Sequence, residues 1–196
     1  MKVLEIASLH NIPEEMQHLF FPAVFLGFGV LGALFPFHTW SPDGHASAPT
    51  AVSMLHAGVL MKLGGYGCFR IAMYLMPEGL AQWGDFFLIL TTVSVVYGAF
   101  SAVVQTDSSV SHCGLVLFAL LMATRTSCTG AILQMLSHGL MTALFFALIG
   151  MIYGRTHTRD VRELNGLMKV MPFLAVGYVI AGLANLGLPG LSGFVA

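Results

Sequence analysis

The chain has 196 residues, of which 57% are hydrophobic and only 9% are charged, and its formal net charge is −1 at pH 7. A soluble domain usually carries about 25% charged residues, so this composition excludes an ordinary soluble protein and predicts an integral membrane protein. The few charges form no basic face, which excludes a nucleic-acid-binding protein. The expected partners are lipid and other apolar helices.

Apolar stretches recur along the chain at the length that a bilayer requires. A transmembrane helix needs roughly 20 apolar residues. The sequence offers about six candidate spans, of which the fourth is shorter than this length: Leu19 to Phe37, Thr50 to Met76, Phe86 to Thr106, Val110 to Met122, Gly130 to Tyr153 and Val170 to Leu188. None alternates with period 2, as the strands of a membrane barrel do. We therefore expect an all-α integral membrane protein of about six transmembrane helices, with residues 1–18 as an N-terminal lead-in.

Short turn-rich segments separate the predicted spans: His38 to Pro49, Pro77 to Asp85, Ala123 to Thr129 and Gly154 to Lys169. Basic residues gather in the last of these segments, and the positive-inside rule places it on the cytoplasmic or matrix side. Alternation of the spans then puts the His38 to Pro49 segment on the same side. One junction, at Asp107, is too short for an ordinary connection, so either the turn there is very tight or sequence is missing.

Lys62 lies in the middle of the apolar run from Ala51 to Met76. It is 12 residues from Thr50, about 18 Å along a helix, which places its ammonium near the centre of the bilayer. An ionisable group at that depth is costly and indicates function. Burial disfavours the charged form of a lysine, so a neighbouring charge can switch it, as a proton carrier requires. The alternative is a lysine held in an ion pair between helices.

Two histidines lie within or at the start of apolar runs. His138 lies inside the run from Gly130, and a histidine there either relays protons near neutral pH or hydrogen-bonds a neighbouring helix. His112 lies near the start of its run, where it is either a second relay group or an interfacial cap. Weaker candidates are His56 in the lysine run and, for a solvent-side entry, His38 and His45.

The last segment, ANLGLPGLSGFVA, places glycines and a proline inside an apolar stretch. This pattern predicts either a helix broken at membrane depth or a loop that leaves the membrane. The three cysteines form no C-x-x-C pair, and no P-loop or G-x-G-x-x-G motif is present. We therefore expect no metal, nucleotide or redox cofactor in this chain.

Successive motifs resemble the antiporter-like subunit M family of proton-pumping NADH:quinone oxidoreductase, respiratory complex I, whose mitochondrial counterpart is subunit 4. The motifs are FPFHTWSPDGHASAPTAVSMLHAGVLMKLGGYGCFR, AVVQTD with SSVSHCG, ILQMLSHGLMTALFF, IYGRTHTRDVRELNGL and LANLGLPGLSGFV. They cover nearly everything from about Phe25 to Ala196. The resemblance implies that residues 19–196 form a partial antiporter-like transmembrane domain with a broken last helix.

The resemblance also implies a function, a proton channel driven by quinone reduction elsewhere in the complex. By motif, Lys62 matches the family's central channel lysine, and His112 and His138 match the histidines beyond it. The resemblance places NADH, FMN, iron–sulfur clusters and quinone in other subunits, and it makes other membrane-arm subunits the partners. The membrane would be the bacterial plasma membrane or the mitochondrial inner membrane.

Three departures from the family pattern bear on pumping. Leu31 stands where the family usually has a lysine, the family's basic stretch after Asp107 is absent, and the glutamates at both ends of the family's charge relay are missing. The chain alone is therefore not expected to pump. Two alternatives stay open: an Mrp-type cation/proton antiporter or hydrogenase membrane subunit, and a structural fragment in which Lys62 only forms an ion pair.

Overall fold

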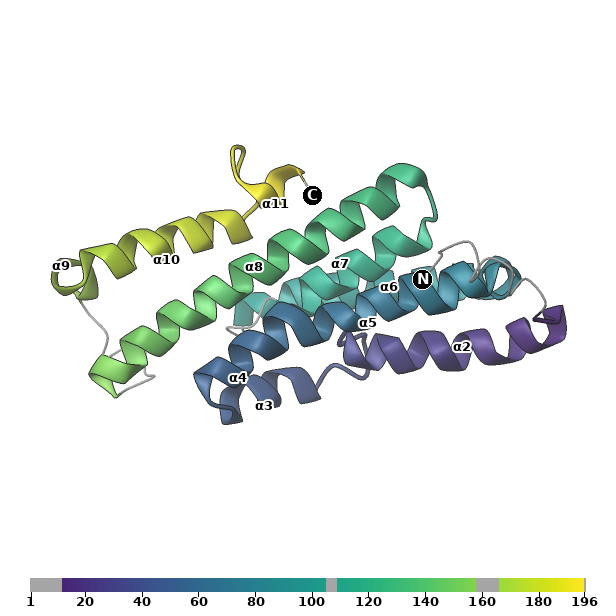
Figure 1. Ribbon diagram of the computed structural model, residues 1–196, viewed down its shortest axis with the longest axis horizontal. Coiled ribbons are helices and arrows are strands. Elements are labelled where there is room, and N and C mark those ends of the chain that lie inside the picture. Colours follow the sequence, from purple (N-terminus) through teal and green to yellow (C-terminus); the bar gives the residue numbers. More distant parts are fainter. Residues whose placement is uncertain (1–11, 105–108, 158–165, 196) are drawn as a thin grey trace, which may run out of the picture.

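The structure, a computed structural model, describes residues 12–104, 109–157 and 166–195. Within these ranges every regular element is a helix, which confirms the all-α prediction. Long rods lie side by side (Figure 1): α10 (Pro172–Asn185) packs along α8 (Arg125–Thr156), and α2 (Glu14–Leu31) packs along α5 (Met61–Gly67).

A short helix, α3 (Trp40–Ser47), lies where the sequence predicts a turn-rich segment. The Ser47 hydroxyl donates to the Asp43 carbonyl at 2.8 Å, and the Trp40 indole donates to the Val30 carbonyl at 3.0 Å, which ties α3 to the end of α2. The loop prediction is therefore wrong for these eight residues. A polar surface helix carries no long apolar run, so an analysis of membrane-length stretches does not detect it.

The lysine run forms one continuous rod that changes its helical type three times. It passes from α4 (Thr50–Leu55) through the π-helical segment η1 (His56–Leu60) to α5, and then into a second π-helical segment, η2 (Cys68–Met73). In a π-helix the hydrogen bonds reach one residue further than in an α-helix, so the turn is wider; such turns are frequent at functional sites.

The remaining helices follow in chain order. They are α6 (Pro77–Val104), α7 (Ser109–Leu121), α8, α9 (Leu167–Val170), α10 and α11 (Ser192–Val195). The segment from Pro77 to Asp85 was predicted as a turn, and that prediction is wrong because a proline fits the first turn of a helix, here of α6. Likewise α8 begins at Arg125, because Thr124 and Ser127 form a capping box there.

The junction at Asp107 lies outside the described residues, but the helices on either side of it pack against each other. With 13 residues, α7 is about 20 Å long, less than the roughly 30 Å of a bilayer core. The helix is therefore short, like the apolar run from Val110 to Met122 that predicts it.

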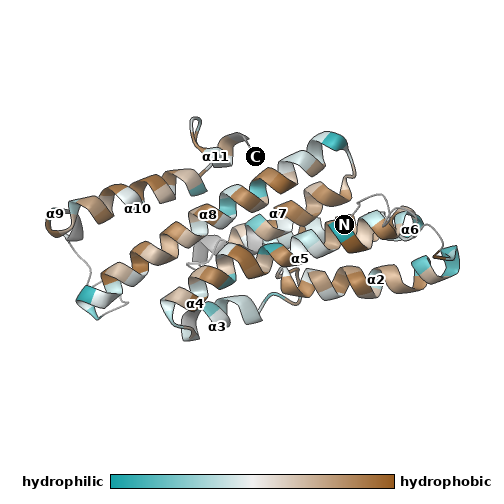
Figure 2. Cartoon of the chain, in the orientation of Figure 1, coloured by the Kyte–Doolittle hydropathy of each residue, from teal (hydrophilic) through white to brown (hydrophobic). Residues whose placement is uncertain are grey.

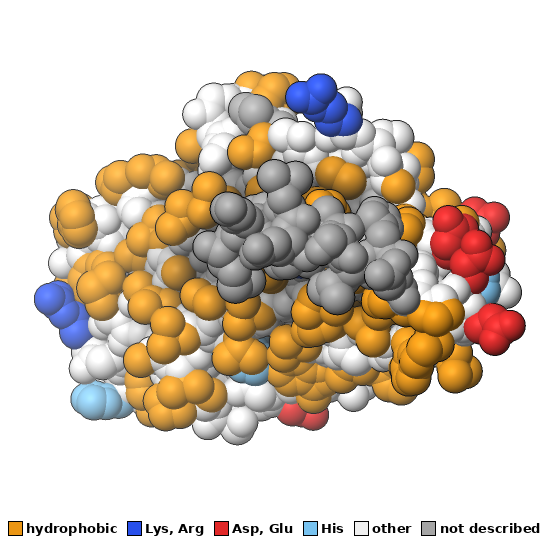
Figure 3. Space-filling model, turned by 45° about the vertical axis from the view of Figure 1, so that its right-hand side comes forward, with side chains coloured by type: hydrophobic (Ala, Val, Ile, Leu, Met, Phe, Trp, Pro, Cys, Tyr) orange, Lys and Arg blue, Asp and Glu red, His pale blue; other side chains and the backbone are white. Residues whose placement is uncertain are grey.

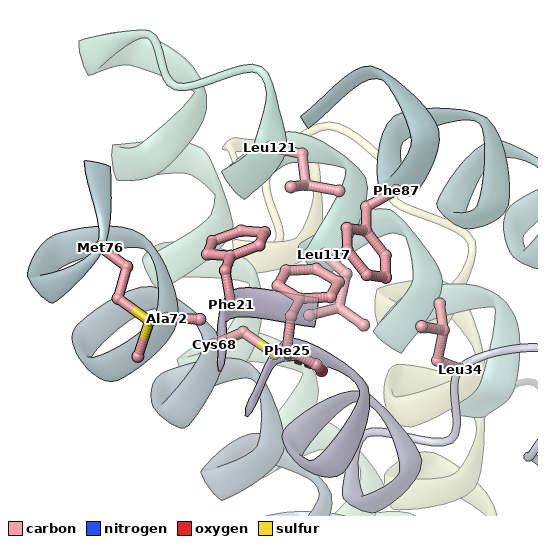
Figure 4. Packing of buried hydrophobic residues seen from close by; sticks show 9 residues of the cluster. All are labelled: Phe21, Phe25, Leu34, Cys68, Ala72, Met76, Phe87, Leu117 and Leu121. Atoms are coloured by element: carbon pink, nitrogen blue, oxygen red, sulfur yellow. Dashed lines mark hydrogen bonds between the residues drawn. The ribbon is translucent and has the colours of Figure 1, made fainter. Parts of the chain in front are cut away.

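Buried apolar side chains join α2, η2, α6 and α7 (Figure 4). Phe25 stands at the centre of this cluster, with its ring centroid 4.5 Å from that of Phe87 and 5.8 Å from that of Phe21. Packing of large rings at this density fixes how the four segments lie against one another.

In the described part of the chain many large apolar side chains are exposed, whereas several polar side chains are buried. Hydrophobic residues make up most of each rod, with hydrophilic residues at the ends and at some positions within (Figure 2), and orange side chains spread over the face seen in Figure 3. The buried polar residues are Gln17, His38, Ser41, Ser53, Thr91, Ser94, Gln134, His138 and Thr142. Two described helices, Pro77–Phe100 and Arg125–Thr156, are long and apolar enough to cross a membrane, so the predicted count of six spans is not confirmed.

The two ends of the bundle differ. Thr50, just after α3, packs against the position of Gly150 near the end of α8, so α3 and the end of α8 lie on the same side, as alternation predicts. At the opposite end, where α2 and α6 begin, acidic side chains gather (Figure 3), and the Gln17 side chain accepts a hydrogen bond from the Glu78 amide. Of the basic loop, Arg159 and Arg162 lie outside the described residues.

Candidate functional site

Lys62 lies in the first turn of α5, directly after the π-helical segment η1. Its side chain is half-buried, and its ammonium donates a hydrogen bond back to the Ala57 carbonyl. The wide turn lets the side chain fold back along its own rod and reach that carbonyl. The lysine is therefore held inside the bundle and directed toward the end of α5 at which α4 and η1 lie.

Two glycines bring the lysine rod into direct contact with α8. A Cβ atom on Gly139 would lie 2.8 Å from the Gly58 carbonyl oxygen, so at this point the two backbones touch. The same Cβ position lies 3.9 Å from Cε of Lys62. Because no side chain fills the crossing, the lysine stem runs across α8 beside His138.

His112 of α7 and His138 of α8 stack on each other. Their ring centroids are 4.6 Å apart and the ring planes differ by 29°. His138 is 3% exposed, and within the described residues its Nε2 atom makes no hydrogen bond. Both rings lie close enough to Lys62 to interact electrostatically with its ammonium. The structure therefore brings together the three residues predicted from the sequence.

Two carboxamides that the sequence analysis missed also contact His112. Nε2 of Gln134 lies 3.1 Å from Nδ1 of His112, and Asn185 at the end of α10 forms a side-chain hydrogen bond with the same ring. Gln134 precedes His138 by four residues, so both lie on one face of α8. That spacing was a usable signal for Gln134, whereas the contact of Asn185 depends on how α10 packs.

Two cavities meet at the histidine pair. The first, about 10 Å³, holds roughly one water molecule and is lined by Lys62, His112, Gln134 and His138 together with apolar and glycine residues of α5, α7 and α8. The second, about 190 Å³, lies beyond the pair and is lined by Ser137, Asn185 and the backbone around Gly187. The histidine pair therefore lies between the lysine and the larger cavity.

The wall of the second cavity is the interruption between α10 and α11. Gly187 and Gly190 there have φ angles of +66° and +96°, a conformation that favours glycine. The Ser192 hydroxyl accepts a hydrogen bond from Ser137 at 2.8 Å, which ties α11 to α8. The helical chain is thus interrupted where the glycine and proline pattern predicts, and Gly187 of the interruption lines the cavity.

The weaker candidates lie elsewhere. His45 and His56 contact each other with ring centroids 4.9 Å apart, and they pack with Trp40 and Phe146 at the α3 end of the bundle. His38 is 7% exposed and lies between Phe35 and Tyr97, which does not suit a solvent-side entry. None of the three histidines lines either cavity described above.

The other polar groups near the site serve the helix backbone. The Thr142 hydroxyl donates to the His138 carbonyl of its own helix at 2.7 Å, which is a side-chain-to-backbone bond within α8. Leu31, at the family's usual lysine position, is half-buried and is not among the residues that line the cavities. Among the described residues no group of three or more histidine, cysteine or acidic side chains could hold a metal ion.

Comparison with known proteins assigns the chain to a family. The family described as "NADH:quinone oxidoreductase/Mrp antiporter, TM" matches residues 2–196. An NAD(P)H-quinone oxidoreductase chain 4 of Picosynechococcus is 45% identical over 192 residues, which cover 94% of this chain and 35% of the relative. NADH-quinone oxidoreductase subunit M of Rickettsia bellii is 36% identical over 193 residues, which cover 95% of this chain and 39% of the relative.

A solved structure, respiratory complex I from Thermus thermophilus with bound NADH, contains a chain that superposes with a TM-score of 0.86 at 33% identity. The match covers 94% of this chain and 41% of that chain. The present chain thus spans well under half the length of the relatives that it matches. It belongs to the NADH:quinone oxidoreductase/Mrp antiporter transmembrane family.

Proposed function

We propose that the chain is a membrane-arm component of a proton-pumping NADH:quinone oxidoreductase, with about six transmembrane helices, and that it conducts protons through Lys62, His112 and His138. NADH, FMN, iron–sulfur clusters and quinone belong to other subunits, and the membrane is a bacterial plasma membrane or a mitochondrial inner membrane. The proposal rests on the family and on the relatives that carry the oxidoreductase name.

The observation that carries the proposal is the row of groups from the lysine to the broken helix. Lys62 and the histidine pair line one cavity, and the pair also lines the cavity at the α10–α11 interruption. Each group in this row can hold a proton or pass one on. A row of such groups, joined by water-sized spaces inside an apolar bundle, is what proton transfer through a membrane requires.

The chemistry of one transfer follows from these positions. The Lys62 ammonium releases a proton to water in the first cavity and becomes a neutral amine. A histidine ring takes up this proton on one nitrogen and releases a proton from the other nitrogen into the second cavity. The Ala57 carbonyl, which accepts a hydrogen bond from the lysine, holds the amine close to its place between transfers.

An Mrp-type cation/proton antiporter is the second candidate, because the family description also includes such antiporters. It would exchange protons for sodium without electron transfer. A structural fragment is the third candidate, and it would support assembly of the complex without conducting protons. The relatives from Picosynechococcus and Rickettsia carry the oxidoreductase name, which favours the first candidate.

A comparison of membrane vesicles with and without the chain tests the proposal. Proton uptake is followed by quenching of a pH-sensitive dye, first with NADH and quinone and then with a sodium gradient alone. We expect that deletion of the chain removes part of the uptake driven by quinone reduction, which we call the chain's share. Uptake that depends on the chain and follows the sodium gradient alone would support an antiporter and overturn the proposal.

A further inference from the structure

We propose that Gln134 is a positioning residue that gates proton passage between the two cavities by fixing the ring of His112. This inference rests on the proposed proton-conducting function and adds a residue that holds no proton itself. It follows from how the cavities share their walls and from the contacts of the two histidine rings.

The partition between the cavities consists of three side chains. His112, Gln134 and His138 are the residues that line both cavities. Two of them are imidazoles, which can accept and release protons, and the third is a carboxamide, which cannot. Gln134 is 9% exposed, so it is buried with the rings and is not a surface group that happens to reach them. A proton that moves from one cavity to the other therefore passes beside Gln134.

The hydrogen bond of Gln134 sets which nitrogen of His112 carries the proton. The amide nitrogen of Gln134 faces Nδ1 at 3.1 Å, and an amide N–H can only donate. In the neutral ring Nδ1 therefore accepts, and the ring proton lies on Nε2. When the ring takes up a second proton, that proton binds Nδ1 and points at the N–H of Gln134. The carboxamide must then rotate so that its oxygen, which can accept a hydrogen bond, faces Nδ1. Each protonation of Nδ1 is thus coupled to a rotation of the Gln134 side chain.

Because the two rings stack, protons can reach them only at the ring edges, and one of these edges carries Nδ1 of His112. Because the planes of His112 and His138 differ by only 29° at a centroid distance of 4.6 Å, the rings meet by their faces. Their nitrogens lie at the ring edges, where water or side chains approach. Nε2 of His138 makes no hydrogen bond within the described residues, whereas Nδ1 of His112 is occupied by Gln134. Gln134 therefore covers one of the edges at which a proton could leave or enter the pair.

The surroundings of His112 define what a charge at Gln134 would do. The titratable groups that face the ring are Lys62 of α5 and His138 of α8, with Cys113 of α7 in the same cavity. The neutral Asn185 approaches from α10, and on the other side of α7 the neutral Ser94 of α6 lies against Gly114. Among the described residues, these groups include no carboxylate, so Gln134→Glu would add an anion next to the ring of His112.

Two substitutions with different chemistry test the gate in assembled membranes. Gln134→Glu keeps the shape, and its carboxylate accepts from Nδ1–H and stabilises the protonated ring. We expect the pH profile of the chain's share of proton uptake to move to higher pH by about one unit or more. Gln134→Met keeps the length but removes the hydrogen bond. We expect this variant to lose most of the chain's share while the amount of assembled complex on a native gel stays normal.

The chain offers a matched control in Gln17. It is also buried, at 6% exposed, and its side chain bonds the Ile12 carbonyl and the Glu78 amide, far from the cavities. Gln17→Met should leave the pH profile unchanged. An unmoved pH profile in Gln134→Glu would overturn the gate even if Gln134→Met lost activity, because that pattern indicates only a packing role.

The same measurements separate this inference from the proposed function. If Lys62→Ala keeps the full share of proton uptake, the proton-conducting function fails, and the gate fails with it. If Lys62→Ala loses the share while both Gln134 variants behave as the unaltered chain does, the function stands and only the gate is overturned.

Discussion

Replacement of Lys62 by alanine is expected to remove the whole of this chain's share of proton uptake at a normal level of assembled complex. The lysine is the only ammonium among the residues that line the two cavities, and without it the first cavity keeps only the histidine pair. The α8 crossing is a backbone contact between Gly58 and Gly139, so the loss of the lysine stem leaves this contact in place. Proton uptake driven by NADH and quinone, divided by complex on a native gel, measures this.

Arg70 provides the control for this variant. It lies eight residues further along the same rod, is half-buried, and has its guanidinium 5.1 Å from the centroid of the Tyr74 ring. Arg70→Ala removes a basic side chain of the same rod without touching a cavity, so it should keep the share. If Lys62→Ala lowers assembly and leaves uptake per assembled complex unchanged, Lys62 has only a structural role.

Replacement of Gly64 by alanine is expected to prevent normal packing of the lysine rod. A Cβ atom at this position would lie 2.5 Å from the Gly32 backbone nitrogen and 2.7 Å from the Phe28 carbonyl oxygen. Because both are backbone atoms, α2 and α5 would have to move apart. Overpacking of this kind typically costs about 1–3 kcal/mol, and more when backbone shifts. The amount of assembled complex and its thermal stability should both fall clearly.

Gly27, in α2, the helix against which Gly64 packs, is the matched position for that test. A Cβ atom there would meet nothing within 4 Å, and alanine favours a helix over glycine by up to about 1 kcal/mol. Gly27→Ala should therefore assemble at least as well as the unaltered chain. Equal assembly of the Gly64→Ala and Gly27→Ala variants would contradict the close packing of α2 and α5.

The helical rods could be predicted from the sequence because the apolar runs are long and do not alternate with period 2, which indicates membrane helices and excludes barrel strands. Their ends could not, since a helix does not stop where apolar sequence stops: α6 extends back to Pro77 and α8 to Arg125. The helix α3 was not predicted because it is polar and has no long apolar run. The π-helical turns of the lysine rod leave no apolar pattern of their own, so only the structure reveals them.

Part of the candidate site could also be predicted from the sequence, and part could not. Lys62, His112 and His138 stand out in sequence because an ionisable side chain is rare in an apolar run. Gln134 does not stand out, because a neutral carboxamide costs less there, and its partner His112 lies 22 residues away on another helix. The two cavities depend on how α5, α7, α8 and α10 pack together, which no local pattern contains.

The central claim is that Lys62 and the histidine pair act in series, and a double substitution tests it most directly. Proton uptake per assembled complex would be compared in Lys62→Ala, in His138→Phe, which keeps an aromatic ring in the stack, and in the variant with both changes. Groups on one path give the same loss separately and together, because either change blocks the path. The account predicts that all three variants lose the same share. A double variant that loses the sum of two smaller losses, or a single variant that loses nothing, would contradict it.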